Sequence, residues 1–107
     1  MAHISQDQDV ITLINVFTVE PEDQQRLVDL LVEATEATMS DQPGYVSANI
    51  HRSLDGTKVT NYAQWRRRED FEAMLGRADA RVHIGEAAKL ASRFEPQLYE
   101  VAFSDAR

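Results

Sequence analysis

Residues 45–66, which read YVSANIHRSLDGTKVTNYAQWR, decide the fold. Two runs of strand-like composition, 45–53 and 58–66, flank the dipeptide Asp55-Gly56, which is typical of a two-residue β-hairpin turn of type I′. Counting outward from that turn predicts the cross-strand pairs Leu54 with Thr57, Arg52 with Val59, Ile50 with Asn61, Ala48 with Ala63, and Val46 with Trp65.

This register divides the hairpin into two faces, because cross-strand partners point to the same side of a sheet. One face is mostly apolar, and we expect helices to cover it: Val46, Ala48, Ile50, Val59, Asn61, Ala63 and Trp65. The opposite face is mixed: Tyr45, Ser47, Asn49, His51, Thr60, Tyr62 and Gln64.

The segments before the hairpin predict one strand and one helix. Residues 10–19 are apolar and β-branched on both alternating sides, which indicates a strand buried on two faces. Pro21, with acidic residues directly after it, suits the first turn of a helix. Apolar residues then recur at helical spacing until Pro43-Gly44 stops the run.

After the hairpin, residues 69–75 predict a short helix closed by Gly76. Asp79 can cap a second helix running to about residue 92, and Pro96 then ends any helix. The apolar side of that helix is expected to be Val82, Ala87, Leu90 and Ala91. Residues 98–103 predict a last strand. The order βαββ(αα)β is that of an α+β, ferredoxin-like split βαβ sandwich with its helices on one side of the sheet.

Length and composition indicate one domain, over residues 10–103, with tails at 1–9 and 104–107. No apolar run approaches the roughly 20 residues of a spanning helix, and the start does not resemble a secretory signal, so we expect a cytoplasmic protein. The absence of Cys excludes thiolate chemistry, and no His or carboxylate cluster has metal-ligand spacing. The net charge of −7 disfavours nucleic acid as a partner, and the run Arg66-Arg67-Arg68 fits a solvated helix entry better than a phosphate site.

The sheet face that no helix covers predicts an assembly. It carries Tyr45, Tyr62, His51 and Asn49, together with Phe17 or Val16 of the first strand. A small domain seldom exposes so large a mixed apolar patch, so we expect a homodimer in which two such faces pack together. The alternative is a monomer with a hydrated sheet.

Asn61 and Trp65 are the most informative polar groups, because both are predicted on the helix-covered face. A buried amide and a buried indole N–H each need a hydrogen-bond partner, which is either another protein group or a ligand. The small residues opposite them, Ala48, Ala63, Ala87 and Ala91, would leave room for a flat apolar ligand. Of the histidines, His51 is expected at the dimer face, whereas His83 faces either the cavity or solvent.

Residues 59–65, Val-Thr-Asn-Tyr-Ala-Gln-Trp, followed by Arg68-Glu-Asp-Phe71, resemble the antibiotic biosynthesis monooxygenase family of the dimeric α/β-barrel superfamily. The stretches 43–48 and 53–57 and the end at 98–101 are similar to the same family. The resemblance implies that the chain oxidises a polycyclic aromatic phenol of the anthrone type to a quinone with O2, without flavin, haem or metal. An electron-rich phenol, once deprotonated, can itself reduce O2, so the protein need only bind it and stabilise its oxyanion.

In that family, Asn61 and Trp65 match the positions of N–H donors to the developing charge. We group His83 with them as the candidate catalytic residues, and Asn15, Phe71 and Met74 as candidate substrate-binding residues. Two positions depart from the family. Phe71 stands where well-studied members have a proton-handling Tyr, and the region of a family Arg reads Ile84-Gly85-Glu86, with Arg81 one turn earlier.

These departures keep two other functions open. The chain could bind a small aromatic ligand without reacting with it. It also loosely resembles the haem-degrading branch of the superfamily, which pairs a strand Asn with a helix His and a helix Trp. Asn15 and His83 suit two of those positions, but Met74 occupies the place of the Trp.

Overall fold

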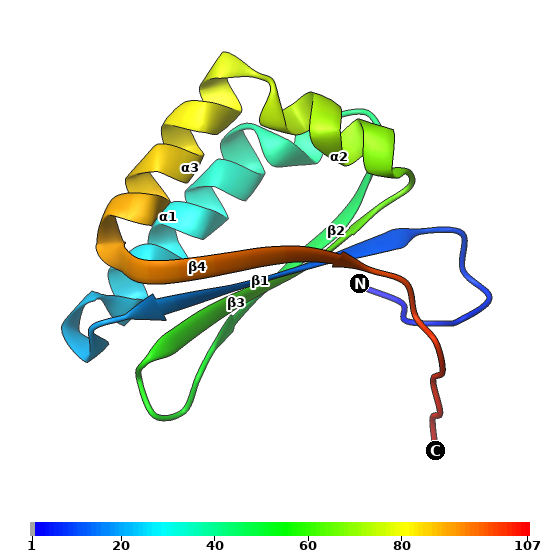
Figure 1. Cartoon of the computed structure of the whole chain (residues 1–107), viewed down its shortest axis with the longest axis horizontal. Helices are drawn as coiled ribbons and strands as arrows, with labels where there is room; N and C mark the ends of the chain where they lie inside the picture. The colour runs from blue at the N-terminus through cyan, green and yellow to red at the C-terminus, as the bar shows by residue number, and fades with distance from the viewer. Residues whose placement is uncertain (1) are drawn as a thin grey trace.

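The computed structural model describes residues 2–107 as a four-stranded antiparallel sheet, in the order β2-β3-β1-β4, with its helices on one side (Figure 1). The strands are β1 (Ile11–Val19), β2 (Tyr45–Arg52), β3 (Lys58–Trp65) and β4 (Ala91–Tyr99). The helices are α1 (Gln24–Ala37), α2 (Arg68–Leu75) and α3 (Ala78–Leu90), with short 3-10 turns at Pro21–Asp23 and Met39–Asp41. The predicted α+β ferredoxin-like fold is confirmed.

The hairpin register is confirmed at its centre and wrong at both ends. Arg52 pairs with Val59, Ile50 with Asn61 and Ala48 with Ala63. At the far end, however, the pairing shifts between Tyr45 and Ser47, and Trp65 pairs with Tyr45 instead of Val46. This irregularity is a β-bulge, which adds one residue to β2 and reverses the side to which the residues beyond it point.

The turn is longer than the sequence predicts. Ser53 and Lys58 close the hairpin, with the Ser53 N–H donating to the Lys58 carbonyl at 3.0 Å, so that Leu54 to Thr57 form the loop. Gly56 has a φ of +82°, but no residue other than glycine has a positive φ among residues 2–107, which rules out type I′. The Asp55 carboxylate instead accepts hydrogen bonds from Ser53 and Thr57, and this local network replaces the expected turn.

The end of the chain departs most from the prediction. Helix α3 stops at Leu90, and β4 begins directly after it, seven residues earlier than expected, and ends at Tyr99. Pro96 lies inside β4, which is an edge strand, so its missing N–H does not break a ladder between two partners. Asp79 is not the N-cap of α3, and Val82, predicted on the apolar side, is exposed.

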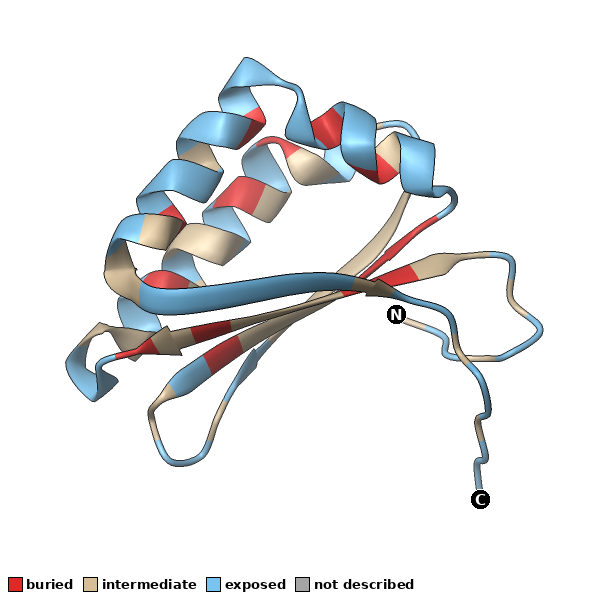
Figure 2. Cartoon of the chain, in the orientation of Figure 1, coloured by how far each residue is buried: buried red, intermediate tan, exposed pale blue. Residues whose placement is uncertain are grey.

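The two faces of the sheet differ as predicted. Buried residues lie on the strands and on the helices that cover them (Figure 2). They form two core clusters, one around Leu13, Ala63 and Trp65 and the other around Phe17 and Val59. Phe17 therefore belongs to the helix side.

The opposite face is partly covered by the N-terminal residues. Gln64 is 1% exposed there, accepting a hydrogen bond from the Ser47 hydroxyl and donating one to the His3 carbonyl at 2.6 Å.

Candidate active site

A cavity of about 430 Å³ lies between the helices and the sheet. Its volume falls in the range of small-molecule sites, and most of its lining is apolar. The cavity brings together the six residues that the sequence singled out: Asn15, Asn61, Trp65, Phe71, Met74 and His83. Of the small residues expected to leave it open, Ala48, Ala63 and Ala87 line it, whereas Ala91 does not.

Two asparagines form a polar rung across the floor of the cavity. Asn15 of β1 and Asn61 of β3 are direct partners in the antiparallel ladder, so their side chains point to the same side, roughly 5 Å apart at Cβ. The Oδ1 atom of each is buried and accepts no hydrogen bond from residues 2–107. A buried acceptor without a partner costs about 1–3 kcal/mol, so each of these two oxygens lowers the stability of the fold.

The rung also divides the core. On β1 it lies between Leu13 and Phe17, which belong to different hydrophobic clusters, and on β3 Asn61 lies between Val59 and Ala63 in the same way. The cavity is therefore the gap between two separately packed halves of the core.

Three aromatic rings form one wall. Trp65 is 2% exposed and lies edge-on to Tyr45 and to Phe71, with centroid distances of 5.8 and 6.1 Å. The end of β3 is held in place where the Arg66 N–H donates to the Gly44 carbonyl at 2.7 Å. The indole is thus fixed by packing on both of its sides.

Tyr45 is a site residue that sequence reasoning placed on the wrong face. The bulge in β2 turns its side chain toward the helices, where it lines the cavity. Burial raises the pKa of its hydroxyl above the ordinary 10.0, and the Ala48 backbone amide offsets part of that rise. Tyr45 therefore stays protonated near neutral pH and can donate a hydrogen bond, which Phe71 cannot. The register shift lies between Tyr45 and Ser47, where no glycine or proline marks it in the sequence; Gly44, with a φ of +83°, lies directly before the strand.

His83 and His51 lie on opposite sides of the sheet. His83 of α3 lines the cavity, which settles its predicted position in favour of the cavity. His51 lies on the opposite sheet face, is exposed, and has its Nδ1 3.1 Å from the Asn49 carbonyl oxygen.

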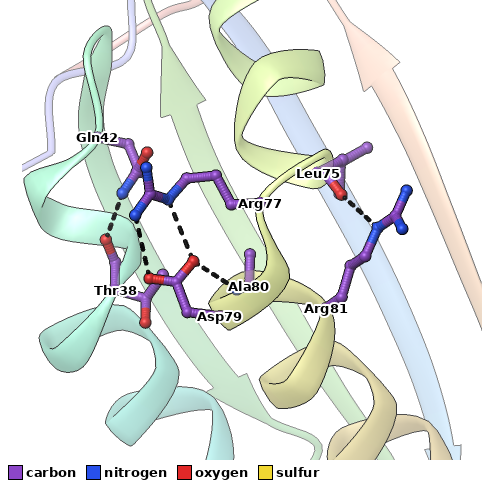
Figure 3. Close-up of polar contacts among 7 residues, drawn as sticks. All are labelled: Thr38, Gln42, Leu75, Arg77, Asp79, Ala80 and Arg81. Carbon is purple, nitrogen blue, oxygen red and sulfur yellow. Dashed lines mark hydrogen bonds and ion pairs between the residues drawn. The ribbon is translucent and has the colours of Figure 1, made fainter.

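Arg81 is the arginine one helical turn before the position where the family has an Arg, and it lies near the connection between α2 and α3 (Figure 3). Arg81 donates from Nε to the Leu75 carbonyl at 3.3 Å and does not line the cavity. Asp79 accepts two hydrogen bonds from Arg77 and one from the Ala80 N–H, and these lower its pKa. Arg81 thus joins the end of α2 to α3 instead of reaching a ligand.

Two kinds of feature are not found in the part of the chain that the structure describes. Within residues 2–107, no three His, Asp or Glu side chains are grouped so that they could hold a metal ion. Over the same residues, no helix has the length and apolar character needed to cross a membrane.

The fold and the cavity define a ferredoxin-like α+β domain with a small-molecule cavity between its sheet and its helices, and comparison with known proteins gives the family. The model of the antibiotic biosynthesis monooxygenase family matches residues 10–95, and the chain belongs to that family. It is 45% identical, over 104 residues, to tetracenomycin-F1 monooxygenase of Streptomyces glaucescens, an alignment covering 97% of this chain and 92% of that protein.

Solved structures show the same fold at lower identity. SnoaB, a cofactor-independent oxygenase from Streptomyces nogalater, superposes with a TM-score of 0.74 at 23% identity, covering 91% of this chain and 97% of SnoaB. A monooxygenase from the gene ActVA-Orf6 of Streptomyces coelicolor, in complex with the ligand nanaomycin D, gives a TM-score of 0.79 at 24% identity and covers 91% of each chain.

Proposed function

We propose that this protein is a cofactor-independent monooxygenase that oxidises a polycyclic phenolic compound of the anthrone type to a quinone with O2. The single observation that carries the proposal is the Asn15–Asn61 rung, which places two asparagine side chains in the lining of an apolar cavity, with Oδ1 atoms that have no partner among residues 2–107. The 45% identity to tetracenomycin-F1 monooxygenase supports this reaction class.

The proposed reaction needs no group beyond substrate and O2. A deprotonated anthrone transfers electrons to O2, one oxygen atom bonds to the ring carbon that loses its hydrogens, and the other oxygen leaves as water. The Nδ2 groups of Asn15 and Asn61 and the Trp65 indole N–H would donate hydrogen bonds to the ring oxygens and stabilise the negative charge that develops there. His83 is the candidate proton acceptor, because it lines the cavity and a neutral imidazole nitrogen can accept a proton from a substrate. Phe71 and Met74 would supply apolar contact to the rings.

O2 uptake with an anthrone such as dithranol tests this function. We expect the purified protein to accelerate uptake, to incorporate label from ¹⁸O2 into the quinone, and to lose about 100-fold in rate on Asn61→Ala or Asn15→Ala, the effect of removing one donor to an oxyanion. His51→Ala, on the opposite face, is the matched control and should keep its rate. No rate above buffer with any anthrone or hydroquinone would refute the proposal.

A second function is binding of an aromatic ligand without reaction. It is favoured by Phe71, which has no hydroxyl group, and by Arg81, which donates its Nε–H to the Leu75 carbonyl instead of lining the cavity. It predicts a ligand that quenches Trp65 fluorescence and raises the melting temperature but is recovered unchanged under air. Haem binding, the remaining alternative, predicts a Soret band when haem is titrated into the protein, and the absence of the band would dismiss it.

We also propose that the chain forms a homodimer through the open sheet face. Ile14, Val16 and Tyr62 are half-buried on that face, and Tyr99 at the end of β4 is 47% exposed, so apolar area is left uncovered in a single chain. Sedimentation velocity at micromolar concentration should give twice the chain mass, and Val16→Lys should reduce it to one. A single-chain mass for the unmodified protein would contradict the proposal. A cytoplasmic location remains a prediction from the sequence.

A further inference from the structure

The charged residues of this protein are distributed unevenly between its surface and its cavity. The chain carries 18 Asp and Glu against 11 Lys and Arg. Among residues 2–107, however, no carboxylate lines the cavity, whereas the arginine Arg68 does. The cavity lining of this acidic protein therefore contains no acidic side chain and one arginine.

Arg68 stands at the rim of this cavity. It is the first residue of α2, and its side chain is 68% exposed while still contributing to the lining. Its ion-pair partner within the described residues is Glu72, with Nε and Oε2 3.8 Å apart, which is too long for a hydrogen bond. The neighbouring Arg67, by contrast, donates two hydrogen bonds to Asp70 at 3.1 and 3.0 Å. Of these two arginines, Arg68 is the one with its donors available to a ligand.

We propose that the ligand of the cavity carries a carboxylate on one edge of its ring system, and that Arg68 holds this group at the mouth. The inference rests on the proposed function in that it takes an aromatic ligand as the occupant. A guanidinium presents its donors as a planar fork that matches a carboxylate, and such pairs are stronger than neutral hydrogen bonds. The uncharged rings would then lie between Trp65 and the Asn15–Asn61 rung.

Binding of two matched ligands tests this assignment without any turnover. Anthraquinone-2-carboxylate and anthraquinone-2-carboxamide have the same rings and are already oxidised, so isothermal titration calorimetry measures affinity alone. We expect the unmodified protein to prefer the carboxylate by about fivefold, equivalent to roughly 1 kcal/mol for an ion pair at the surface. Arg68→Met should abolish that preference and leave the affinity for the carboxamide unchanged.

Two further variants make the test specific. Arg66→Met removes the same charge from an exposed residue that does not line the cavity, and it should keep the preference. Glu72→Gln removes the acidic neighbour of Arg68 and should increase the preference. Equal affinities for the two ligands, or a loss of preference shared by Arg66→Met and Arg68→Met, would overturn the inference and leave the proposed function standing. Failure of both ligands to bind at millimolar concentration would overturn the inference, while O2 uptake with dithranol would still decide the proposed function separately.

Discussion

Asn61→Leu is expected to make the protein more stable and less active. The Asn61 Oδ1 atom is buried and has no protein partner, whereas leucine has a similar volume and no polar atom to satisfy. An unpartnered buried polar group costs about 1–3 kcal/mol, so its removal should raise the free energy of unfolding by about 1 kcal/mol. For a domain of this size, that corresponds to an increase of about 4 °C or more in melting temperature.

Gln64→Leu is the matched control for this prediction. Gln64 lies on the same strand and is also buried, but its amide oxygen accepts from Ser47 and its amide nitrogen donates to His3. Its replacement removes both bonds and should lower the free energy of unfolding by about 1–3 kcal/mol. Urea denaturation at one fixed protein concentration measures both variants, and O2 uptake measures the activity of Asn61→Leu. If Asn61→Leu is destabilised as much as Gln64→Leu, the amide is satisfied within the folded protein and the reasoning is refuted.

Three further predictions concern the site wall, the hairpin loop and two glycines. Tyr45→Phe should keep the melting temperature and lower the rate of anthrone oxidation at least about tenfold, because the hydroxyl donor is lost while the ring packing stays. Hydrogen bonds lower the Asp55 pKa from 3.8 to about 2, so the stability it contributes is present above about pH 4 and lost as the pH falls toward 2. Asp55→Asn should therefore lower the urea midpoint at pH 7, and the gap to the unmodified protein should narrow between pH 4 and 2; a gap that does not change with pH would contradict this origin. Gly44→Ala should be destabilised by at least about 1–2 kcal/mol, because its φ is positive and the added Cβ would overlap the Asp70 carboxylate. Gly85→Ala, in open space on a helix, should gain about 0.5–1 kcal/mol, and equal thermal shifts for the two variants would contradict both assignments.

The sequence predicts the fold where short-range patterns and sheet geometry agree. Counting outward from the hairpin turn places Asn61 and Trp65 on the helix-covered face without any knowledge of the loop conformation, because the observed four-residue loop keeps the same pairing as the predicted two-residue one. The prediction fails at the start of β2, where one inserted residue reverses the side of the sheet to which the preceding side chain points. The bulge after Tyr45 moves that side chain to the other face, and nothing in counting from Asp55-Gly56 detects it.

The second failure has a different physical cause. Pro96 is a helix terminator by local chemistry, and this led to a late start for the last strand. At an edge, however, proline is compatible with a strand, and which strand forms the edge depends on the whole sheet. Whether the cavity is open is likewise a property of the packed molecule: small residues at Ala48, Ala63 and Ala87 permit a gap, but the positions of the helices determine its volume.

The cavity floor corresponds to a pattern in the sequence, in which an asparagine interrupts the apolar helix-facing positions of two neighbouring strands. On β1 the helix-facing positions are Leu13, Asn15 and Phe17, and on β3 they are Val59, Asn61 and Ala63, so an amide interrupts each apolar series at the same rung of the ladder. One polar residue at a core position is usually satisfied by the protein around it. Two on adjacent strands, both without protein partners, divide the core into two clusters and leave a polar floor between them. Under the proposed function, the same two asparagines would contact the phenolic ligand.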